Sequence, residues 1–323
     1  MPSIVTLTMN PAVDLSTSVE RLEPVRKLRC SEGRRDPGGG GINVARVVSR
    51  FGAEVTAVYP IGGSIGQLLK RMVDAEGVKS AAIPVLGDTR EDFTVLDEAT
   101  GQQYRFVLSG PHLQEVEWRD CLKALVALGS GSDFVCISGS LPPGVPDDLY
   151  GQVAQTLVSG GVKLALDTSG PALRSALGHH VYLVKPNRQE LRELVGPGPD
   201  DHASLVKSCR DLIASCGVEV VALTLGAEGS LLVTADRAWR AAALAIRPVS
   251  TVGAGDSFLG AMIWALASSM TLEESFRYAV AGASAALLVP GTELCRPQHV
   301  RRLLGQVTIK ELTGQPVGRR SKF

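Results

Sequence analysis

The sequence has no excess of charge of either sign, because 33 lysines and arginines balance 33 aspartates and glutamates. A neutral chain has no overall field that would attract nucleic acid or an anionic membrane. No apolar run approaches the roughly 18 residues needed to cross a bilayer, and the first residues lack the features of a signal peptide. We therefore expect a cytoplasmic protein without nucleic-acid or membrane partners, in which any anion is bound by a local site.

Other signatures are also missing. The six cysteines include no Cys-x-x-Cys pair and the five histidines show no metal-ligand spacing, so neither a disulfide framework nor a zinc site is expected. No Gly-Lys dipeptide is present, which excludes a Walker A loop. Residues 62–66 match the G-x-S-x-G pattern of serine hydrolases, but the oxyanion loop that should accompany it is absent.

Short β-branched runs alternate with longer amphipathic stretches along most of the chain. This is the pattern of parallel βαβ units, in which helices cover both faces of a sheet. Strands are predicted at residues 4–9, 55–60, 134–138, 164–167, 182–185 and 220–225. Helices are predicted at residues 42–50, 67–76, 118–128, 148–159, 188–194, 202–215 and 258–267. The fold class is therefore α/β with a mainly parallel central sheet.

Two segments interrupt this alternation. Residues 91–96 and 103–108 are extended runs separated by Asp97-Glu98-Ala99-Thr100-Gly101, which is a hairpin signal. Residues 15–35 form a second extended segment without helical periodicity. Both segments are either surface excursions or parts of a small β lid over an active site.

No internal repeat or low-complexity linker divides the chain. Its 323 residues are enough for one large α/β domain or two small ones. We expect residues 1–312 to form a single domain with lid segments at approximately 14–36 and 88–110. Residues 313–323 predict a frayed C-terminal tail.

Four consecutive glycines, Gly38 to Gly41, lead directly into a predicted helix. Glycine permits positive φ and close backbone approach, and a helix N-terminus presents free N–H groups to an oxygen-rich ligand. The run is either a flexible loop or a binding loop. Four glycines before an ordered helix are costly unless something approaches the backbone, which favours binding.

A second glycine motif, Ser250 to Phe258, leads into another apolar helix. The backbone amides of Gly253, Ala254 and Gly255 would form an anion hole suited to a migrating phosphoryl group. Asp256 would then accept the proton of a substrate hydroxyl. The alternative is that Asp256 only caps the helix, but the combination of features fits phosphoryl transfer better.

A third candidate follows the predicted strand at residues 182–185. Asn187 and Glu190 are three residues apart at the start of a helix, hence on one face, and could hold phosphate oxygens and a hydrated Mg²⁺. A helix cap with glutamate at its third position explains the same residues equally well.

Together these motifs resemble the ribokinase (PfkB) family of carbohydrate kinases. The family signature D-T-x-G-A-G-D is matched by Ser250–Asp256, with serine for the first aspartate as in the phosphosugar branch. The resemblance extends from Ile4 to Leu304 and implies a ribokinase-like three-layer α/β/α fold with a small β-sheet lid. Further stretches shared with the phosphofructokinase branch are Thr6-Leu7-Thr8, Lys27–Cys30, Pro37–Arg46, Gln103–Phe106, Ser138–Gly144 and Val184–Asn187.

The resemblance also implies roles for individual residues. Asp256 matches the general base, and Gly253, Ala254 and Gly255 match the anion hole. The residues expected to bind the sugar phosphate are Asp14, Lys27, Arg29, Gly39, Gly40, Asn43, Arg90 and Ser140. The residues expected to bind ATP are Lys185, Asn187, Thr224, Gly226, Gly229, Thr251 and Ser284. Glu190 is expected to organise Mg²⁺, and a K⁺ site is expected at Ser250, Val252, Ala286 and Gly291.

The implied activity is ATP- and Mg²⁺-dependent phosphorylation of fructose 6-phosphate at its 1-hydroxyl, by a homodimer that pairs through its lids. Kinases of tagatose 6-phosphate or fructose 1-phosphate are the alternatives, although 1-phosphofructokinases usually carry Gly-Gly-Lys-Gly in place of Gly38–Gly41. Val289 and Glu293 depart from the Asn and Arg of the similar enzymes near the K⁺ positions. A non-catalytic sugar-phosphate sensor is the alternative from another class, and it would need a damaged base or anion hole.

Overall fold

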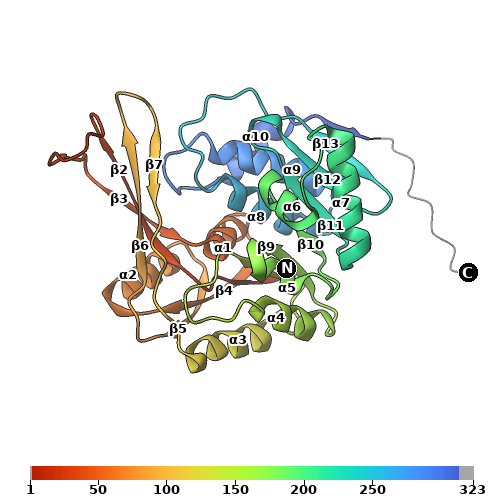
Figure 1. Cartoon of the computed structure of the whole chain (residues 1–323), viewed down its shortest axis with the longest axis horizontal. Coiled ribbons are helices and arrows are strands. Elements are labelled where there is room, and N and C mark those ends of the chain that lie inside the picture. Colours follow the sequence, from red (N-terminus) through yellow and green to blue (C-terminus); the bar gives the residue numbers. More distant parts are fainter. Residues whose placement is uncertain (1, 313–323) are drawn as a thin grey trace, which may run out of the picture.

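The computed structural model describes residues 2–312 and contains a large twisted sheet of ten strands (Figure 1). Seven neighbouring strands are parallel, in the order β5 (Lys79–Pro84), β4 (Glu54–Ile61), β1 (Ser3–Leu7), β8 (Phe134–Ser138), β9 (Lys163–Asp167), β10 (Leu183–Val184) and β11 (Val220–Thr224). Three antiparallel strands extend the sheet beyond β11: β12 (Ser230–Val233), β13 (Ala238–Ala241) and β14 (Ile309–Glu311). The central strands are apolar along their length because both of their faces are covered.

Two hydrophobic clusters lie on opposite faces of this sheet. On one face pack α1 (Gly40–Arg50), α2 (Gly63–Ala75), α8 (Ala254–Ala267), α9 (Leu272–Ala286) and α10 (Pro297–Leu304). On the other face pack α3 (Glu115–Gly129), α4 (Leu149–Val158), α5 (Gly170–Ala176), α6 (Arg188–Val195) and α7 (His202–Cys216). The predicted three-layer α/β/α architecture is confirmed.

A separate sheet of four strands stands at one side of the molecule (Figure 1). Its order is β3 (Arg34–Gly38), β2 (Ala12–Val19), β6 (Arg90–Asp97) and β7 (Gln103–Phe106). The predicted hairpin is confirmed, since β6 and β7 pair antiparallel with Phe93 opposite Phe106. The two extended segments noted in the sequence thus both contribute strands to the small sheet.

The expectation of continuous extended structure over residues 15–35 is wrong in its middle. Strands occupy both ends, but residues 20–33 belong to no strand. Pro24 has no N–H to donate to a ladder, and Val25, fully exposed, has a φ of 61°. These two residues interrupt strand pairing, so the segment forms an exposed loop between β2 and β3.

The predicted elements of the main sheet are all present, with shifts at their ends. Helix α3 begins three residues before the expected start because Gln114 and Glu117 form a capping box ahead of the apolar face. Helix α8 begins at Ala254 rather than Phe258, which places Asp256 inside the first turn. No helix among residues 2–312 is both long enough and apolar enough to cross a membrane. The tail predicted at 313–323 lies outside the described residues.

Candidate active site

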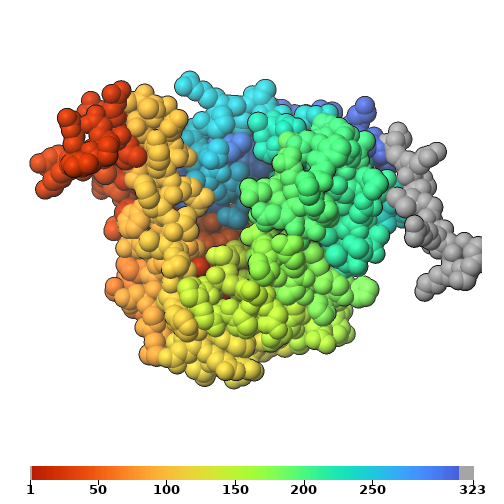
Figure 2. Space-filling model, viewed as in Figure 1, coloured from red at the N-terminus to blue at the C-terminus, as the bar shows by residue number. Residues whose placement is uncertain are grey.

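A cavity of about 300 Å³ lies between the small sheet and the carboxyl ends of the parallel strands. Figure 2 shows the hollow between the β6–β7 hairpin and the C-terminal half of the molecule. Open α/β sheets bind ligands at this edge. The predicted residues that line the cavity are Asp14, Gly39, Gly40, Asn43, Arg90, Ser140, Glu190, Val252, Gly253 and Asp256. Residues separated by more than 240 positions in sequence are thus brought together.

The glycine run is ordered and begins α1 directly against the main sheet. Gly39 has a φ of 106°, which disfavours any residue with a side chain. A Cβ on Gly40 would lie 2.1 Å from the Ser138 side-chain oxygen, at the end of β8. The glycines therefore let the α1 N-terminus reach the floor of the cavity, where its backbone N–H groups are presented to a ligand.

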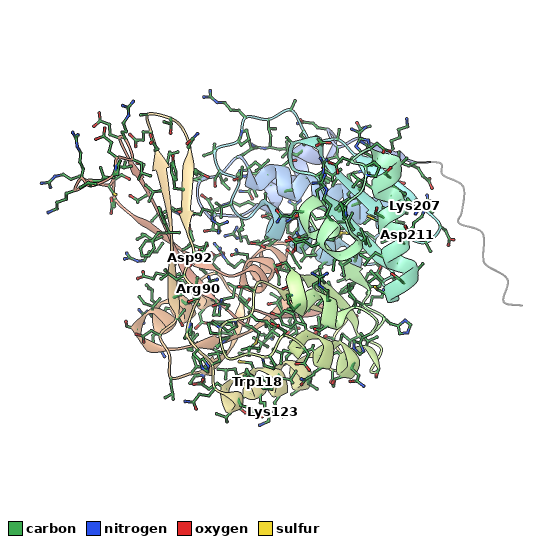
Figure 3. All side chains as sticks on the ribbon, viewed as in Figure 1. Arg90, Asp92, Trp118, Lys123, Lys207 and Asp211 are labelled. Atoms are coloured by element: carbon green, nitrogen blue, oxygen red, sulfur yellow. The ribbon has the colours of Figure 1, made fainter. Side chains whose placement is uncertain are left out.

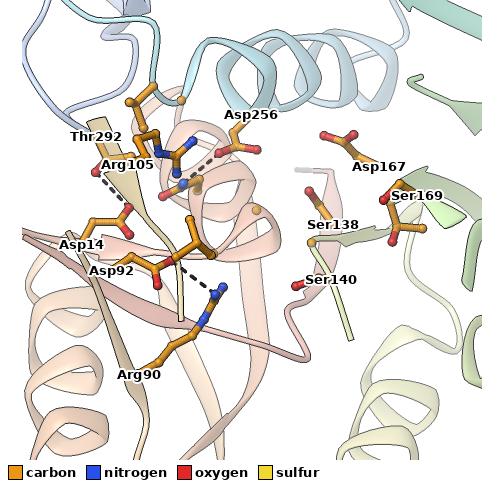
Figure 4. Close-up of a pocket in the computed structure, with 18 of the residues that line it drawn as sticks. Asp14, Arg90, Asp92, Arg105, Ser138, Ser140, Asp167, Ser169, Asp256 and Thr292 are labelled. Carbon is orange, nitrogen blue, oxygen red and sulfur yellow. Dashed lines mark hydrogen bonds and ion pairs between the residues drawn. The ribbon is translucent and has the colours of Figure 1, made fainter. Parts of the chain in front are cut away.

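Asp256 sits in the first turn of α8 but does not cap it. The N-cap is Gly253, whose φ of 75° is the left-handed conformation that glycine adopts readily. The Asp256 carboxylate instead accepts a hydrogen bond of 2.8 Å from Asn43 Nδ2, at the start of α1. The capping alternative is therefore excluded, and the two glycine motifs meet at this hydrogen bond (Figure 4).

The surroundings of Asp256 suit a proton acceptor. Its pKa is raised to about 6, chiefly by burial and next by the nearby Asp167 carboxylate, while the Asn43 hydrogen bond and the Lys185 charge act in the opposite direction. A base whose pKa lies just below neutral pH is ionised yet still able to take a proton. The free N–H groups at the α8 N-terminus lie beside it, where negative charge on a transferring group would be stabilised.

Asp167, which was not predicted from the sequence, lines the cavity on the same side as Asp256 (Figure 4). It is the last residue of β9 and forms an ion pair of 3.0 Å with Lys185 Nζ. Burial alone would lower the pKa of Lys185, but the attraction and hydrogen bond of Asp167 outweigh it and the pKa is raised. Lys185 therefore stays a cation close to Gly255, beside the anion hole.

Arginine side chains from the small sheet reach the cavity. Arg90 and Asp92 both line the cavity, and Figure 3 shows them at the end of β6 that is nearer to the main sheet. The Arg90 guanidinium donates to the backbone oxygens of Leu108 and Asn10, at 2.6 and 2.9 Å, and its Nη1 lies 3.4 Å from an Asp92 carboxylate oxygen. Its buried Nε has no hydrogen-bond partner among residues 2–312. Arg105, on β7, also lines the cavity and forms no ion pair within the described part of the chain. Arg105 is therefore the arginine whose charge is left free for an anionic ligand, and Arg90 adds a second positive charge beside it.

Asp14 and Thr292 close the cavity from the side of β2. Thr292 Oγ1 donates to Asp14 Oδ2 at 3.1 Å (Figure 4). The pKa of Asp14 is raised to about 6, chiefly by burial, and the Thr292 hydrogen bond keeps it from rising further. The carboxylate can therefore still accept hydrogen bonds from ligand hydroxyls near neutral pH, as its predicted role requires. Thr292 was not found from the sequence.

Lys27 and Arg29 do not line this cavity. Both side chains are exposed in the loop of residues 20–33, beyond the outer end of the small sheet. Within one chain, the basic side chains at the cavity are Arg90, as predicted, and Arg105, which the sequence analysis quoted only as part of a shared stretch. One chain alone does not bring Lys27 and Arg29 to Arg90, and their role toward the sugar phosphate stays a prediction.

The predicted nucleotide positions follow the neighbouring strand ends. Asn187 bridges to Thr224, at the ends of β10 and β11, and residues 226–229 form a tight turn with positive φ at Gly226 and Gly229. Thr251 is exposed just before α8, and Ser284 is buried on α9. None of these positions lines the cavity itself. They extend outward from Lys185 along the same edge of the sheet.

Asn187 and Glu190 form the capping box that competes with a ligand role. Glu190 Oε2 accepts from the Asn187 backbone N–H at 2.8 Å, and Asn187 Oδ1 accepts from the Glu190 N–H at 2.9 Å. Glu190 nevertheless lines the cavity, and burial raises its pKa. No group of three metal-ligating side chains exists in the described part of the chain. One carboxylate is still compatible with Mg²⁺, which usually keeps several waters and binds phosphate oxygens.

The predicted K⁺ positions are only partly assembled. The Ser250 hydroxyl accepts from the Val252 N–H at 3.2 Å and donates to the Gly291 carbonyl at 3.5 Å. Ala286 is buried on α9. Val289 offers no side-chain oxygen, and Glu293 is held by Arg34 and Arg296. Backbone oxygens would therefore have to provide most of a cation site here.

Comparison with known proteins agrees with this geometry. Residues 4–299 match the family described as pfkB family carbohydrate kinase. The chain is 42% identical to the ATP-dependent 6-phosphofructokinase isozyme 2 of Mycobacterium tuberculosis, over 98% of this chain and 91% of that protein. It is 32% identical to the 1-phosphofructokinase of Borreliella burgdorferi, over 96% and 99% of the two chains.

A solved structure shares the fold. The crystal structure of phosphofructokinase-2 from Escherichia coli in complex with potassium superposes with a TM-score of 0.90 and 37% identity, covering 95% of this chain and 99% of that one. The ribokinase-like α/β/α fold with its small separate sheet is thereby confirmed. The chain belongs to the pfkB family of carbohydrate kinases.

Proposed function

We propose that this enzyme transfers the γ-phosphoryl group of ATP to the 1-hydroxyl of fructose 6-phosphate, giving fructose 1,6-bisphosphate. The observation that carries this proposal is the Asp256–Asn43 pair at the α8 N-terminus, in one cavity with two arginines. Asp256 accepts the hydroxyl proton as the oxygen attacks phosphorus. The amides of Gly253, Ala254 and Gly255 stabilise the charge on the transferring group.

Arg90 and Arg105 favour an acceptor that already carries a phosphate. A phosphate dianion gains charge-assisted hydrogen bonds from guanidinium groups, whereas an uncharged sugar leaves the charge of Arg105 without a counter-ion. Asp14 and Asn43 then hold sugar hydroxyls, and Gly39, Gly40 and Ser140 shape the wall around them. Relatives named 6-phosphofructokinase and 1-phosphofructokinase both match, so the second candidate is phosphorylation of fructose 1-phosphate or tagatose 6-phosphate.

ATP is proposed to lie along Lys185, Asn187, Thr224, Gly226, Gly229, Thr251 and Ser284. Mg²⁺, when bound with the nucleotide, neutralises charge on its phosphates, and Glu190 is the carboxylate placed to orient the hydrated ion. K⁺ near Ser250 and Gly291 is proposed from the potassium complex named for the E. coli relative. A homodimer through the small sheet would cover its exposed Phe93, Tyr104 and Phe106.

A substrate panel tests the proposed activity. We expect ADP release by the purified protein to be fastest with fructose 6-phosphate, slower with fructose 1-phosphate and tagatose 6-phosphate, and slowest with ribose. Each value of kcat/KM is measured at saturating ATP and Mg²⁺. Turnover only with an unphosphorylated sugar would contradict the role of Arg90 and Arg105. Binding of sugar phosphate without any turnover would instead support the sensor alternative.

The pH dependence of the reaction tests the base. The pKa of Asp256 is about 6 and the base must be ionised, so kcat/KM should be level above pH 7 and fall as the pH drops through 6. Asp14 has a similar pKa and must also be ionised to accept sugar hydroxyls, which steepens the fall. We expect at least a tenfold loss from pH 6 to pH 5, measured with the protein verified as folded. A flat profile down to pH 5 would contradict the raised pKa of Asp256.

A further inference from the structure

Helix α1 buries an arginine that no step of the proposed reaction uses. Arg46 is only 1% exposed, although arginine is almost never fully buried unless it is paired. It forms an ion pair of 2.6 Å with Glu76 on one side. On the other side its Nη1 donates to three oxygens: Asn43 Oδ1 at 3.0 Å, the Pro37 carbonyl at 2.9 Å and the Thr292 carbonyl at 3.0 Å.

The bond to Asn43 determines which way the Asn43 amide faces. Its oxygen accepts from Arg46, and its nitrogen donates to Asp256. Turning the amide over would set its NH₂ group against the guanidinium, which has only donors, and its oxygen against the carboxylate, which has only lone pairs. Both contacts would become repulsive. Arg46 thus makes Asn43 a hydrogen-bond donor toward Asp256.

The same guanidinium group also ties together two segments that carry cavity residues. Pro37 lies in β3 of the small sheet, next to the glycine run. Thr292 donates through its hydroxyl to Asp14 while its carbonyl accepts from Arg46. A single buried side chain therefore contacts Asn43, the hydrogen-bond partner of Asp256, and Thr292, the hydrogen-bond partner of Asp14.

We propose that Arg46 is a positioning residue, which holds the Asn43 amide in the orientation that keeps Asp256 ionised and aimed at the substrate hydroxyl. This inference rests on the proposed function, in which Asp256 is the base. Arg46 touches neither substrate nor reacting atoms. Its effect is transmitted through one amide group.

Arg46→Met removes the donor and keeps most of the side-chain volume. The freed amide can turn its oxygen toward Asp256, so the carboxylate loses a hydrogen bond that stabilises its charged form. We expect kcat to fall about tenfold and the acid limb of the pH profile to move up by about one pH unit, with the KM for ATP unchanged. The charged groups facing Asp256, namely Asp167, Asp14, Lys185 and the two cavity arginines, remain in place.

Arg50→Met is the matched control. Arg50 lies one turn further along α1, pairs with the same Glu76 and donates to the Glu293 and Cys295 carbonyls. It does not touch Asn43. We expect this variant to lose stability but to keep the wild-type acid limb. An equal shift of the limb in both variants would show that Arg46 acts only on general packing and would overturn the proposal.

A double-mutant cycle separates the amide from the charge of Arg46. In an Asn43→Ala background there is no amide to orient, so adding Arg46→Met should change kcat by less than twofold and leave the acid limb in place. If Arg46 acted through its charge alone, its removal would shift the limb equally in both backgrounds. That result would contradict the positioning role.

A direct titration keeps this inference separate from the choice of substrate. The ¹³Cγ resonance of Asp256, identified by its loss in Asp256→Asn, reports the carboxyl pKa without any turnover. We expect Arg46→Met to raise that pKa and Arg46→Lys, which keeps a donor, to raise it less. An unchanged pKa in folded Arg46→Met would overturn the inference even if the enzyme phosphorylates fructose 6-phosphate. If Arg46→Met does not fold, an Arg46→Lys pKa equal to that of the wild type and of Arg50→Met would overturn it as well.

Discussion

Asp256→Asn should turn over its sugar phosphate about 10³-fold more slowly than the wild-type enzyme, within the range that general bases contribute. The asparagine keeps the size of the side chain and an oxygen that can accept from Asn43, so KM values for sugar phosphate and ATP should stay within about threefold. Loss of kcat without loss of binding identifies an interaction made in the transition state. Steady-state kinetics at pH 8 measure both parameters.

Asp211→Asn is the control for this substitution. Asp211 lies on the solvent-exposed side of α7 and pairs with Lys207, four residues earlier (Figure 3). The same chemical change at that position should leave kcat unaltered, because Asp211 does not line the cavity. The variant should also stay folded, since exposed ion pairs of this kind contribute little to stability. Near wild-type kcat in Asp256→Asn would show that another group removes the proton.

The Asp256→Asn variant should also be more stable than the wild type at pH 8. Folding raises the pKa of Asp256 from 3.8 to about 6, so the folded state binds its proton more tightly than the unfolded state. Above pH 6 the wild type must bury the charged carboxylate, which costs at most about 3 kcal/mol for this shift. The advantage of asparagine should shrink as the pH falls through 6 and vanish below about 4. Thermal melts at pH 8 and pH 5 measure it.

Two glycine-rich runs were enough to locate the candidate site in the sequence. Gly38–Gly41 and Gly253–Gly255 are unusual runs, and each stands where a helix starts against the sheet. Such backbone requirements are local, so a linear sequence records them. Asn43 and Asp256 follow directly from these runs. What the sequence could not give is that the two side chains meet, because that contact spans 213 positions.

The residues that were missed have no local signal. Asp167 is the last residue of β9, an ordinary buried strand, and Thr292 lies in a turn outside any helix or strand. Each becomes part of the site only because parallel strands end at one edge of the sheet. In the sequence Arg46 is only a polar residue of a predicted helix, and its burial depends on Glu76, which follows the end of α2. A search for carboxylates at the last position of predicted strands would have found Asp167.

Lys27 and Arg29 are the opposite case, predicted site residues that one chain does not bring to the cavity. Their positions were transferred from a resemblance, and the single chain holds them on an exposed loop away from the cavity. Resemblance between sequences carries a residue's identity but not its distance from a ligand. Arg90 and Arg105 have a physical reason to bind a phosphate because both line the cavity that holds Asp256.

Arg90→Met should raise the KM for the sugar phosphate at least 100-fold, with little change in the KM for ATP. Methionine fills much of the same volume but supplies no donor, so a bound phosphate would lose a charge-assisted partner in a water-poor site. The Leu108 and Asn10 carbonyls would also lose their donor. A comparison of acceptors separates lost phosphate binding from a disturbed cavity. In Arg90→Met, kcat/KM for unphosphorylated fructose should fall far less than for fructose 6-phosphate, because fructose has no phosphate for Arg90 to bind.

Arg35→Met provides the comparison within the same sheet. Arg35 is half-exposed on β3, pairs with Glu91 and does not line the cavity. Removing it changes the charge of the small sheet as much as Arg90→Met does, but it should leave both KM values within twofold. If the two variants weakened sugar-phosphate binding equally, the general charge of the small sheet would be responsible. If Arg90→Met lowered kcat/KM equally for fructose and for fructose 6-phosphate, Arg90 would support the shape of the cavity, and Arg105 would be left as the phosphate ligand.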